Sequence, residues 1–569
     1  MALQETVRDI DSGTTARFLK IGMLVVVLIG LCTDYLLFQF KGLGTEQAMD
    51  QAQVARSLIS GEGFSTRYIR PLAIQKLTDS GRKVPDGNFP DFYNAPLFPA
   101  LEAAALLPVK SKLEMTAAEV LGKGDIALAV LGIILMLLGV LVWYFVGIAL
   151  FDKPLALLGA GLLLVTDLMW QFALAALPQH LLIILFGLVT LCAVKARQDD
   201  EAGHETRSLG LLCLAALCLG LMSLTHGVTA FLVPGFLVFC FVGFHGRIPS
   251  LLLPLAVYLI MVAPWLVHNQ LACGNFLGLS VHAAVAGAGV TESAVMRGLN
   301  TGLAIGGGMP TKFRTGLLDQ AAHLWEYLGL NITAAAFLLA LLHPFRNPTT
   351  ALWRWIVALM WALAAVGMTL FGVKGAVSGN QLHIIFLPVV VLYGMAFLMV
   401  LWNRLGIGIK ALRITFLSLI FLLAAAPLLI TLLVGQNAKI QWPPYVPPFI
   451  SVLRNWYGPR EVLCSDMPWA VAWYANRKCL LLPETRRSFN DISDYAVLGS
   501  PVVGLYLTPI SGQADFLTLV KGPYKDWGPV IMRTVNLNDF PLKSFTPLPI
   551  DGECILYSDT PRWARKLSP

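Results

Sequence analysis

The sequence predicts a polytopic, all-α membrane domain of about eleven helices over residues 1–434, followed by a soluble α/β domain over residues 435–569. Of the 569 residues, 56% are hydrophobic and 13% are charged, whereas soluble domains average about 25% charged residues. A bilayer core needs roughly 20 apolar residues per helix. Runs of about that length cover 18–38, 125–150, 154–173, 177–195, 208–225, 228–244, 249–267, 321–342, 352–372, 383–401 and 413–434. This composition excludes a soluble enzyme, and the net charge of +7 requires no nucleic-acid partner.

The uneven distribution of basic residues predicts the orientation in the bilayer. With a cytoplasmic N-terminus, the short loops on the cytoplasmic side contain Lys153, Lys195, Arg197, Arg207, Arg247, Arg346, Arg354, Arg404, Lys410 and Arg413. Lys374 is the one basic residue in a short loop on the opposite side. Because short cytoplasmic loops are enriched in Lys and Arg, we expect residues 39–124, 268–320 and 435–569 to lie outside. The expected membrane is a bacterial inner membrane, with the C-terminal domain in the periplasm.

The first outer segment, 39–124, is too long to be a simple connector. Thr45 suits the N-cap of a helix over residues 46–60, and Gly61 ends that helix. Glu46 and Asp50 are four residues apart, so both carboxylates project from one face. A third acid, Asp91, follows later, and a group of cations comes directly after the helix: Arg67, Arg70 and Lys76. Acids beside cations fit a site that handles a hydroxyl and a phosphate. A solvated amphipathic helix with ordinary surface charges is the alternative.

Other polar residues fall at the outer ends of expected spans. Asp167 interrupts an apolar run; an acid inside a span costs roughly 2.5–3.5 kcal/mol, so it is either functional or a helix-end acid in water. Lys374 opposes the charge bias and is expected to face an anion. His268 and His383 have two interpretations, as binding residues or as structural hydrogen-bonding groups. The Gly-rich residues 289–316 are either a mobile lid over a phosphate or a loop along the headgroups.

Three stretches resemble the motifs of a known family. The first, ARSLISGEGFSTRYIRPL (55–72), follows the paired acids. The second, APWLVHNQLACGNFLG (263–278), is similar to a Pro-Trp-x-x-Arg-Asn-x-x-x-x-Gly-Asn run in which His268 replaces the usual Arg. The third, GNQLHIIFLPVVVLYGM (379–395), is similar to an Arg-Tyr-x-x-x-x-x-Pro segment with His383 near the Arg position. Their order and sidedness resemble the GT-C superfamily of membrane glycosyltransferases, in its protein O-mannosyltransferase and aminoarabinose-transferase branch.

The resemblance implies a hexosyl or pentosyl transferase that takes a sugar from a polyprenyl-phosphate-linked donor, with inversion. The acceptor on the outer face would be a glycan, a lipid or a protein. In this family a carboxylate of the first loop removes the proton of the acceptor hydroxyl. By position that acid is Asp50 or Glu46, with Asp50 slightly ahead, and Asp167 matches a second family acid.

The resemblance also implies cations where charge grows on the leaving phosphate. The residues expected to bind substrate are Arg67, Arg70, Lys374, His383, His268 and Asp91. No CxxC or HExxH pattern indicates a metal site. We therefore expect no protein-bound cofactor, although the chemistry leaves room for a divalent cation.

The C-terminal segment contains apolar runs around a Trp/Tyr-rich helix at 460–483, and further strand-like runs at 502–507 and 553–558. Cys464 and Cys479 would face an oxidising compartment, where a disulfide between them is one interpretation. Two other functions are compatible with such a chain. One is a multi-pass transporter or flippase, although no internal repeat or mid-depth charge supports it. The other is a catalytically inactive envelope-assembly protein of the same fold.

Overall fold

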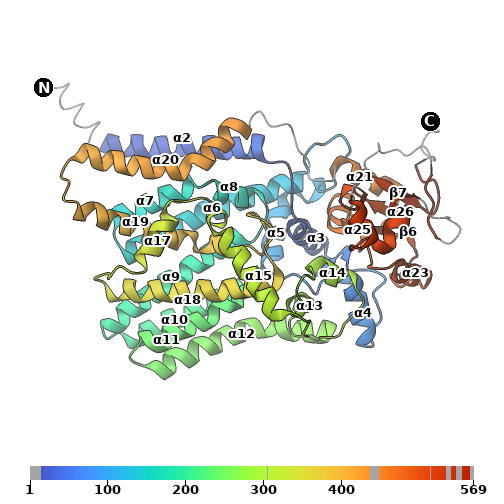
Figure 1. Cartoon of the computed structure of the whole chain (residues 1–569), viewed down its shortest axis with the longest axis horizontal. Coiled ribbons are helices and arrows are strands. Elements are labelled where there is room, and N and C mark those ends of the chain that lie inside the picture. Colours follow the sequence, from blue (N-terminus) through green and yellow to red (C-terminus); the bar gives the residue numbers. More distant parts are fainter. Residues whose placement is uncertain are drawn as a thin grey trace.

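The computed structural model describes residues 14–303, 305–435, 447–512, 514–533, 540–545 and 554–563. Long helices run along the longest axis of the molecule, and an α/β domain lies at one end of them (Figure 1). Between the two lie short helices of the first outer segment, among them α3 (Glu46–Ser60) and α4 (Pro71–Asp79). The molecule therefore has a helical bundle, a polar middle layer and a terminal α/β domain.

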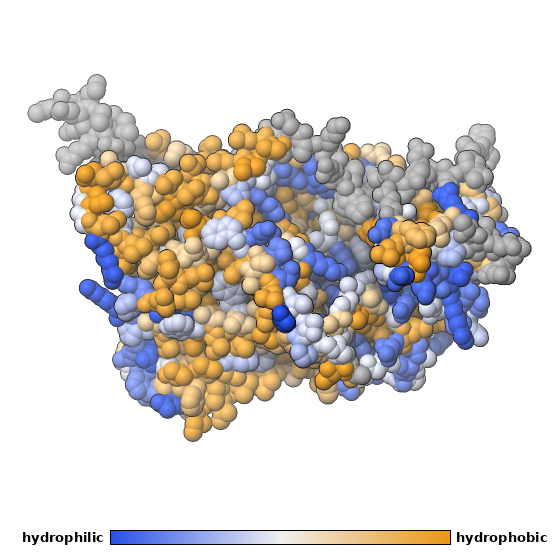
Figure 2. Space-filling model, viewed as in Figure 1, coloured by the Kyte–Doolittle hydropathy of each residue, from blue (hydrophilic) through white to orange (hydrophobic). Residues whose placement is uncertain are grey.

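Eight helices among the described residues are long and apolar enough to cross a membrane. Hydrophobic side chains cover the sides of the bundle, whereas hydrophilic ones gather at its ends and over the α/β domain (Figure 2). The chain is thus a multi-pass membrane protein. The eight are α2 with the π-turn η1 (Thr14–Asp34, Tyr35–Gln39), α6 (Lys123–Leu150), α9 (Gln179–Glu201), α10 (Glu205–Thr225), α12 (Arg247–Cys273), α18 (Pro348–Phe371), η4 with α19 (His383–Phe386, Leu387–Arg404) and α20 (Lys410–Gly435).

Three of the eleven expected spans are not single long helices. The run 154–173 is divided into α7 (Lys153–Leu164) and α8 (Asp167–Leu174), which meet at a bend of 58°. The run 228–244 begins as a 3-10 turn, η3 (Gly227–Leu232), and continues as the short α11 (Val233–Gly243). The run 321–342 is interrupted at Gly329 and Leu330, where φ is 67° and 55°. By length and composition, eight helices of the described residues qualify as single spans, or nine with the bent pair, against about eleven expected.

The run 321–342 is divided among short helices because consecutive left-handed residues cannot continue a right-handed helix. These helices are α15 (Met309–Ala322), α16 (Leu324–Tyr327) and α17 (Thr333–Ala340). Hydropathy alone does not detect such a break, since it records the polarity of the side chains and not the backbone angles.

The first outer segment folds into the polar middle layer. The Thr45 hydroxyl accepts a hydrogen bond from the Ala48 N–H at 3.2 Å, and Gly61 ends α3 with φ of 82°, which confirms the predicted helix and both of its ends. All residues from 48 to 57 are buried, so α3 is not a solvated amphipathic helix. The rest of the segment contains β1 (Ser65–Thr66), β2 (Tyr68–Ile69), β3 (Phe89–Pro90), α5 (Leu97–Leu106) and η2 (Leu107–Lys112).

The C-terminal domain is built on a five-stranded sheet with the strand order β2-β5-β4-β6-β7. Its own strands are β4 (Val462–Ser465), β5 (Lys478–Leu481), β6 (Val502–Leu507) and the antiparallel β7 (Ile555–Ser558). The edge strand β2 comes from the first outer segment, with Tyr68 opposite Cys479 and Ile69 opposite Leu480. Around the sheet lie α21 (Pro447–Trp456), α22 (Pro468–Ala470), the π-turn η5 (Val471–Ala475), α23 (Arg486–Asp494), α24 (Pro509–Gly512), α25 (Phe516–Val520), η6 (Lys525–Trp527) and α26 (Gly528–Ile531).

The sheet register explains why Cys464 and Cys479 are both free thiols. Cys479 is paired with Leu463, whereas Cys464 is paired with Leu480. Because side chains alternate along a strand, the two thiols point to opposite faces of the sheet. The interpretation as a disulfide does not agree with this register.

The second of the three segments expected outside, 268–320, also reaches this end of the bundle. It contains α13 (Ser280–Val285) and α14 (Glu292–Arg297). The Arg297 side chain donates from Nε to the Leu482 carbonyl at 2.8 Å, at the end of β5. All three segments that the charge pattern assigned to one side of the membrane therefore meet at the same end of the molecule.

Candidate functional site

Asp50 and Arg70 form a buried ion pair at the centre of the middle layer. The Asp50 carboxylate is 1% exposed and accepts from Arg70 Nη2 at 2.7 Å and from Asn94 Nδ2 at 2.8 Å. The Arg70 guanidinium lies between two aromatic rings, 3.9 Å from the centroid of Tyr68 and 4.1 Å from that of Tyr93. A cation between two aromatic faces is stabilised by both of them. The charges of Asp50 and Arg70 thus compensate each other inside the protein.

Two more buried carboxyls lie beside this pair. Asn94 Nδ2 also donates to Asp91 at 2.8 Å, so one amide bridges Asp50 and Asp91. Burial raises the pKa of Asp91 to about 6, with a smaller contribution from the negative charge of Asp50. Glu102, on α5, is fully buried, and burial together with the charge of Asp50 raises its pKa well above the ordinary range. Glu102 was not among the expected site residues, although an acid inside the apolar run 97–107 is a signal of the kind that singled out Asp167.

Glu46 lies one turn before Asp50 on α3 but in a different environment. It is half-buried and accepts a hydrogen bond from the Tyr68 hydroxyl at 3.0 Å. Burial raises the pKa of Glu46; the positive charges of Arg70 and Lys374 oppose this rise, and the negative charge of Glu292 adds to it. Of the two acids predicted on this face, Glu46 is the one that remains accessible.

Glu292 lies near Glu46 but comes from the second outer segment, 268–320. It accepts a hydrogen bond from the Tyr93 hydroxyl. It lies in the first turn of α14, which Thr291 caps, and no feature of the sequence distinguishes it from other surface acids. Two cations of the expected lid bond to backbone carbonyls instead of facing an open site: Arg297 to Leu482, and Lys312 to Ala283, Ala284 and Ala286.

Lys374 extends from an ordered loop, 372–382, and its side chain is exposed. Gln179 Nε2 donates to the Ser378 and Gly379 carbonyls at 3.1 and 2.8 Å. Gly379 lies against α3, where an added Cβ would be 1.2 Å from Gln47 Oε1. This close approach places the Lys374 loop directly on the helix that carries Glu46.

Two of the expected substrate-binding residues have structural partners. Arg67 donates to Glu62 at 2.8 Å and to the Asn476 carbonyl at 2.7 Å, which joins the first segment to the C-terminal domain. His383 accepts from Trp361 Nε1 at 2.8 Å through Nδ1, and Nε2 lies 3.0 Å from Gln320 Oε1. Because Nδ1 accepts, Nε2 carries the proton and donates to Gln320. The His383 ring is therefore neutral and has partners on both nitrogens.

Asp167 belongs to a separate cluster between membrane helices. Its carboxylate accepts from the Tyr35 hydroxyl, from Gln171 Nε2 at 2.6 Å and from Thr431 Oγ1 at 3.1 Å. These contacts join η1, α8 and α20. In the described part of the chain, no hydrogen bond or ion pair links Asp167 with Glu46, Asp50 or Asp91.

His268 lines an apolar hollow of about 320 Å³ beside the polar layer. Its ring stacks on Trp265, with 5.0 Å between centroids. Trp265 also meets the edge of Phe64 at 5.2 Å, and the carbonyl of Phe64 accepts from the Asp91 N–H at 3.2 Å. The hollow is therefore adjacent to the buried acids. The residues that line it are Pro96, Leu224, Met261, Pro264, Trp265 and His268.

No group of three or more His, Cys, Asp or Glu side chains among the described residues is arranged to hold a metal ion. The acids of the middle layer bond instead to Arg70, Asn94, Tyr68 and Tyr93. The arrangement combines an accessible carboxylate, an exposed cation and an apolar hollow at one end of a membrane bundle.

Known membrane proteins share the fold of this chain. The profile of a family described as dolichyl-phosphate-mannose-protein mannosyltransferase matches residues 111–268. No curated protein matches the chain by sequence. The Archaeoglobus fulgidus oligosaccharyltransferase, in complex with Zn and sulfate, superposes with a TM-score of 0.53 at 14% identity, over 96% of this chain and 74% of that one. ArnT from Cupriavidus metallidurans in the apo state has a TM-score of 0.52 at 11% identity, over 96% of this chain and 99% of that one. The chain has the GT-C fold.

A second structure of ArnT, bound to undecaprenyl phosphate, superposes equally well, with a TM-score of 0.52 at 11% identity over 95% of this chain and 98% of that one. In the GT-C fold of this chain, the second and third motifs each contact the first outer segment through a glycine. Gly379, in the motif 379–395, meets Gln47, and Gly278, in the motif 263–278, meets Phe92. The structural likeness confirms the resemblance that these motifs suggested.

Gly278 is expected to be sensitive to substitution. Its φ is 66°, and an added Cβ would lie 2.2 Å from the Phe92 carbonyl oxygen, next to Asp91. We expect Gly278→Ala to displace residues 91–94, to lower the free energy of unfolding by more than the roughly 1–3 kcal/mol of backbone strain alone, and to reduce activity. The matched control is Gly274→Ala, with φ of 71° and no atom within 4 Å of its Cβ. Equal unfolding midpoints for the two variants would contradict a role for the Phe92 contact.

Proposed function

We propose that the chain is a membrane glycosyltransferase that moves a sugar from a polyprenyl-phosphate-linked donor to a hydroxyl of an acceptor, with Glu46 as general base. The observation that carries the proposal is the environment of Glu46: a half-buried carboxylate of raised pKa near Lys374, in the same polar layer that the apolar hollow adjoins at Asp91. Two comparisons support the choice of donor. One structure of the same fold holds undecaprenyl phosphate, and the matching family profile is named for a dolichyl phosphate donor.

The proposed reaction is a single displacement at the anomeric carbon of the sugar. The acceptor hydroxyl gives its proton to Glu46 as its oxygen bonds to that carbon. The bond between the anomeric carbon and the phosphate oxygen breaks at the same time, and the electron pair leaves with the polyprenyl phosphate. Attack from the side opposite the leaving group inverts the configuration. Lys374 then faces the negative charge that grows on the phosphate.

Glu46 suits the role of base better than Asp50 because of what each carboxylate touches. Asp50 is 1% exposed and is occupied by Arg70 and Asn94, so an acceptor hydroxyl would have to displace a buried ion pair. Glu46 bonds only to the Tyr68 hydroxyl among the hydrogen bonds of the described residues. We propose that Asp50 and Arg70 hold Tyr68 and Tyr93 in place around Glu46. Asp91 stabilises this group beside them.

The apolar hollow suits the first isoprene units of the donor. We expect Leu224→Trp, which fills the hollow, to weaken binding of undecaprenyl phosphate by about tenfold, or ~1.4 kcal/mol. The matched control is Leu214→Trp, on the same helix but 46% exposed on the bundle surface. Binding is measured by the quenching of tryptophan fluorescence or by calorimetry on the purified protein in detergent. Equal affinity of the two variants for undecaprenyl phosphate would exclude the hollow as the binding site of the prenyl tail.

The pH dependence of turnover is expected to report on Glu46. A general base must be ionised, so turnover should be lost as the pH falls through the pKa of Glu46, which lies above the ordinary range. The charge of Lys374 lowers this pKa. Lys374→Met should therefore move the acid limb of the kcat profile to higher pH, whereas Lys110→Met, at an exposed lysine of the same segment as Glu46, should leave it in place. If the acid limb does not move in Lys374→Met, the charge of Lys374 does not influence the pKa of the general base.

The proposed orientation places this site on the outer face of a bacterial inner membrane, where the acceptor is a glycan, a lipid or a protein. We propose that no protein-bound cofactor takes part. Assays after dialysis against EDTA, with and without added Mg²⁺, test for a divalent cation. Loss of turnover that Mg²⁺ restores would show that a cation assists.

The test of the proposed function uses purified protein in detergent, a panel of undecaprenyl phosphates, each with one labelled hexose or pentose, and envelope glycans, lipids and proteins as acceptors. Release of undecaprenyl phosphate together with an anomerically inverted product is the expected result. Failure to consume any donor of the panel would contradict the proposal and favour an inactive assembly protein. Movement of an intact donor between the leaflets of a proteoliposome would favour a flippase.

A further inference from the structure

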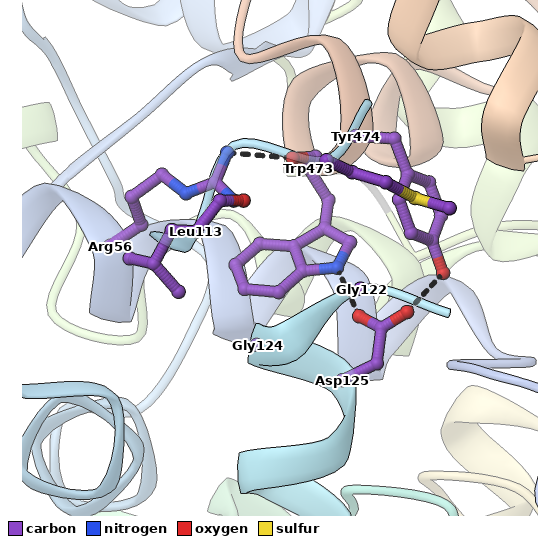
Figure 3. Close-up of a pocket in the computed structure, with 8 residues that line it drawn as sticks. Arg56, Leu113, Gly122, Gly124, Asp125, Trp473 and Tyr474 are labelled. Atoms are coloured by element: carbon purple, nitrogen blue, oxygen red, sulfur yellow. Dashed lines mark hydrogen bonds between the residues drawn. The ribbon is translucent and has the colours of Figure 1, made fainter. Parts of the chain in front are cut away.

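Trp473, on η5 of the C-terminal domain, inserts between the first turn of α6 and the helix α3. Its Nε1 donates to Asp125 Oδ1 at 2.7 Å, and the neighbouring Tyr474 hydroxyl donates to Asp125 Oδ2 at 3.1 Å (Figure 3). Asp125 is 1% exposed and lies in the first turn of a membrane-spanning helix. The C-terminal domain is thereby fixed to the bundle through one buried carboxylate.

Arg56 connects the same tryptophan to α3. Its Nη1 donates to the Trp473 carbonyl at 2.7 Å, its Nη2 donates to the Leu113 carbonyl at 2.9 Å, and its Cζ lies 4.3 Å from the centroid of the Trp473 ring (Figure 3). Trp473 is in the last turn of η5, where carbonyls have no partner within the helix. Arg56 supplies that partner, so we refer to Arg56, Asp125, Trp473 and Tyr474 as the Trp473 junction.

The junction is tightly packed. A Cβ at Gly124 would lie 2.9 Å from the Trp473 ring, and a Cβ at Gly42 would lie 3.5 Å from the Tyr474 hydroxyl. Glycine at the start of α6 therefore gives the indole the room it occupies. A tightly packed contact with directed hydrogen bonds fixes the position of a neighbouring element, whereas a loose one does not.

The same short stretch of the C-terminal domain also reaches the other end of α3. Trp469, four residues before Trp473, meets the edge of the Tyr68 ring at 5.8 Å, and the Tyr68 hydroxyl donates to Glu46. Arg56 and Glu46 are ten residues apart on one helix, about 15 Å along its axis. The stretch 468–475 thus contacts α3 near its C-terminal half directly and near its N-terminus through Tyr68.

We propose that Trp473 is a positioning residue: by joining Arg56 to Asp125, it sets the position of α3, and with it Glu46, relative to the membrane bundle. This inference rests on the proposed function only in its choice of Glu46 as base. The C-terminal domain is then part of the catalytic architecture. Because a displacement of about 1 Å at a reacting group can cost about 10²-fold in rate, small changes at the junction should be visible in kcat.

The test compares Trp473→Phe with Tyr557→Phe in the full-length protein. The first removes the indole N–H that bonds to Asp125. The control removes a buried donor of the same domain, the Tyr557 hydroxyl, which bonds to the Val530 carbonyl at 3.0 Å away from the junction. We expect Trp473→Phe to lower kcat by about 10- to 100-fold, with KM for the donor within about twofold. We also expect the acid limb of its pH profile to move to lower pH, because a displaced Glu46 loses the burial that raises its pKa.

Hydrogen exchange of the α3 amides gives a readout that is independent of activity. Trp473→Phe should accelerate exchange over residues 46–60, and Tyr557→Phe should not. Equal exchange and an unmoved acid limb in the two variants would overturn the proposal. If Trp473→Phe does not fold, Arg56→Lys provides the same test from the α3 side, because lysine lacks the rigid planar guanidinium that lies over the Trp473 ring and directs one N–H to each carbonyl. Wild-type protein that consumes no donor would contradict the proposed function, whereas faster exchange in Trp473→Phe would still support the junction.

Discussion

Replacement of Glu46 by Gln is expected to lower the turnover of the polyprenyl-linked donor by about 10²- to 10⁴-fold, the usual contribution of a general base. The new amide oxygen would still accept the hydrogen bond from the Tyr68 hydroxyl, so the surroundings of the site should remain in place. An amide has no basic oxygen to take the proton of the acceptor. The measurement is the initial rate of undecaprenyl phosphate release, together with the thermal unfolding midpoint, which should change little.

The control for this variant is Glu62→Gln. Glu62 lies just after α3 and forms a partly exposed ion pair with Arg67 at 2.8 Å, a class of contact worth little in stability. Its loss should leave turnover close to that of the wild type. If Glu46→Gln retains turnover within about threefold, Glu46 is not the general base.

Replacement of Asp50 by Asn is expected to have the largest effect on stability. It leaves the Arg70 guanidinium, whose side chain is 3% exposed, without its compensating charge. Removal of one partner of a buried ion pair costs about 3–5 kcal/mol. The measurement is the midpoint of denaturant- or heat-induced unfolding in detergent, which should fall clearly below that of the wild type.

A second substitution separates the charge effect from a loss of packing. In Asp50→Asn/Arg70→Met, both charges are absent, and replacement of a buried pair by apolar groups is often close to neutral for stability. The double variant should therefore recover most of the lost midpoint without recovering activity, since Tyr68 and Tyr93 lose the cation between them. An unchanged midpoint in Asp50→Asn alone would show that the pair does not stabilise the middle layer.

Local patterns in the sequence predicted α3 well but did not predict the partners of its acids. The cap at Thr45, the stop at Gly61 and the four-residue spacing of Glu46 and Asp50 depend only on neighbouring residues. The different environments of the two acids depend on Arg70 and Tyr68, which reach α3 through the turn after it. Nothing in the spacing of the acids distinguishes the accessible carboxylate from the buried one.

Sequence patterns did not predict contacts between residues that are far apart in the chain. His383 is held by Trp361 and Gln320, and Arg67 is held by the Asn476 carbonyl about 400 residues later. For a basic side chain near a membrane surface, the sequence does not distinguish a phosphate partner from a backbone carbonyl partner. Glu292 depends on the path of a long loop, which no local pattern determines.

The edge strand β2 also has a consequence for biosynthesis. Tyr68 is made about 400 residues before Cys479, opposite which it finally pairs; at 5–20 residues per second, translation needs roughly 20–80 seconds to supply that partner. During this interval the segment 39–124 carries an unpaired backbone edge, a liability for aggregation. A ribosome that stalls before β5 would therefore leave the earliest-made part of the protein dependent on chaperones. An excised C-terminal fragment would expose the complementary edge of β5.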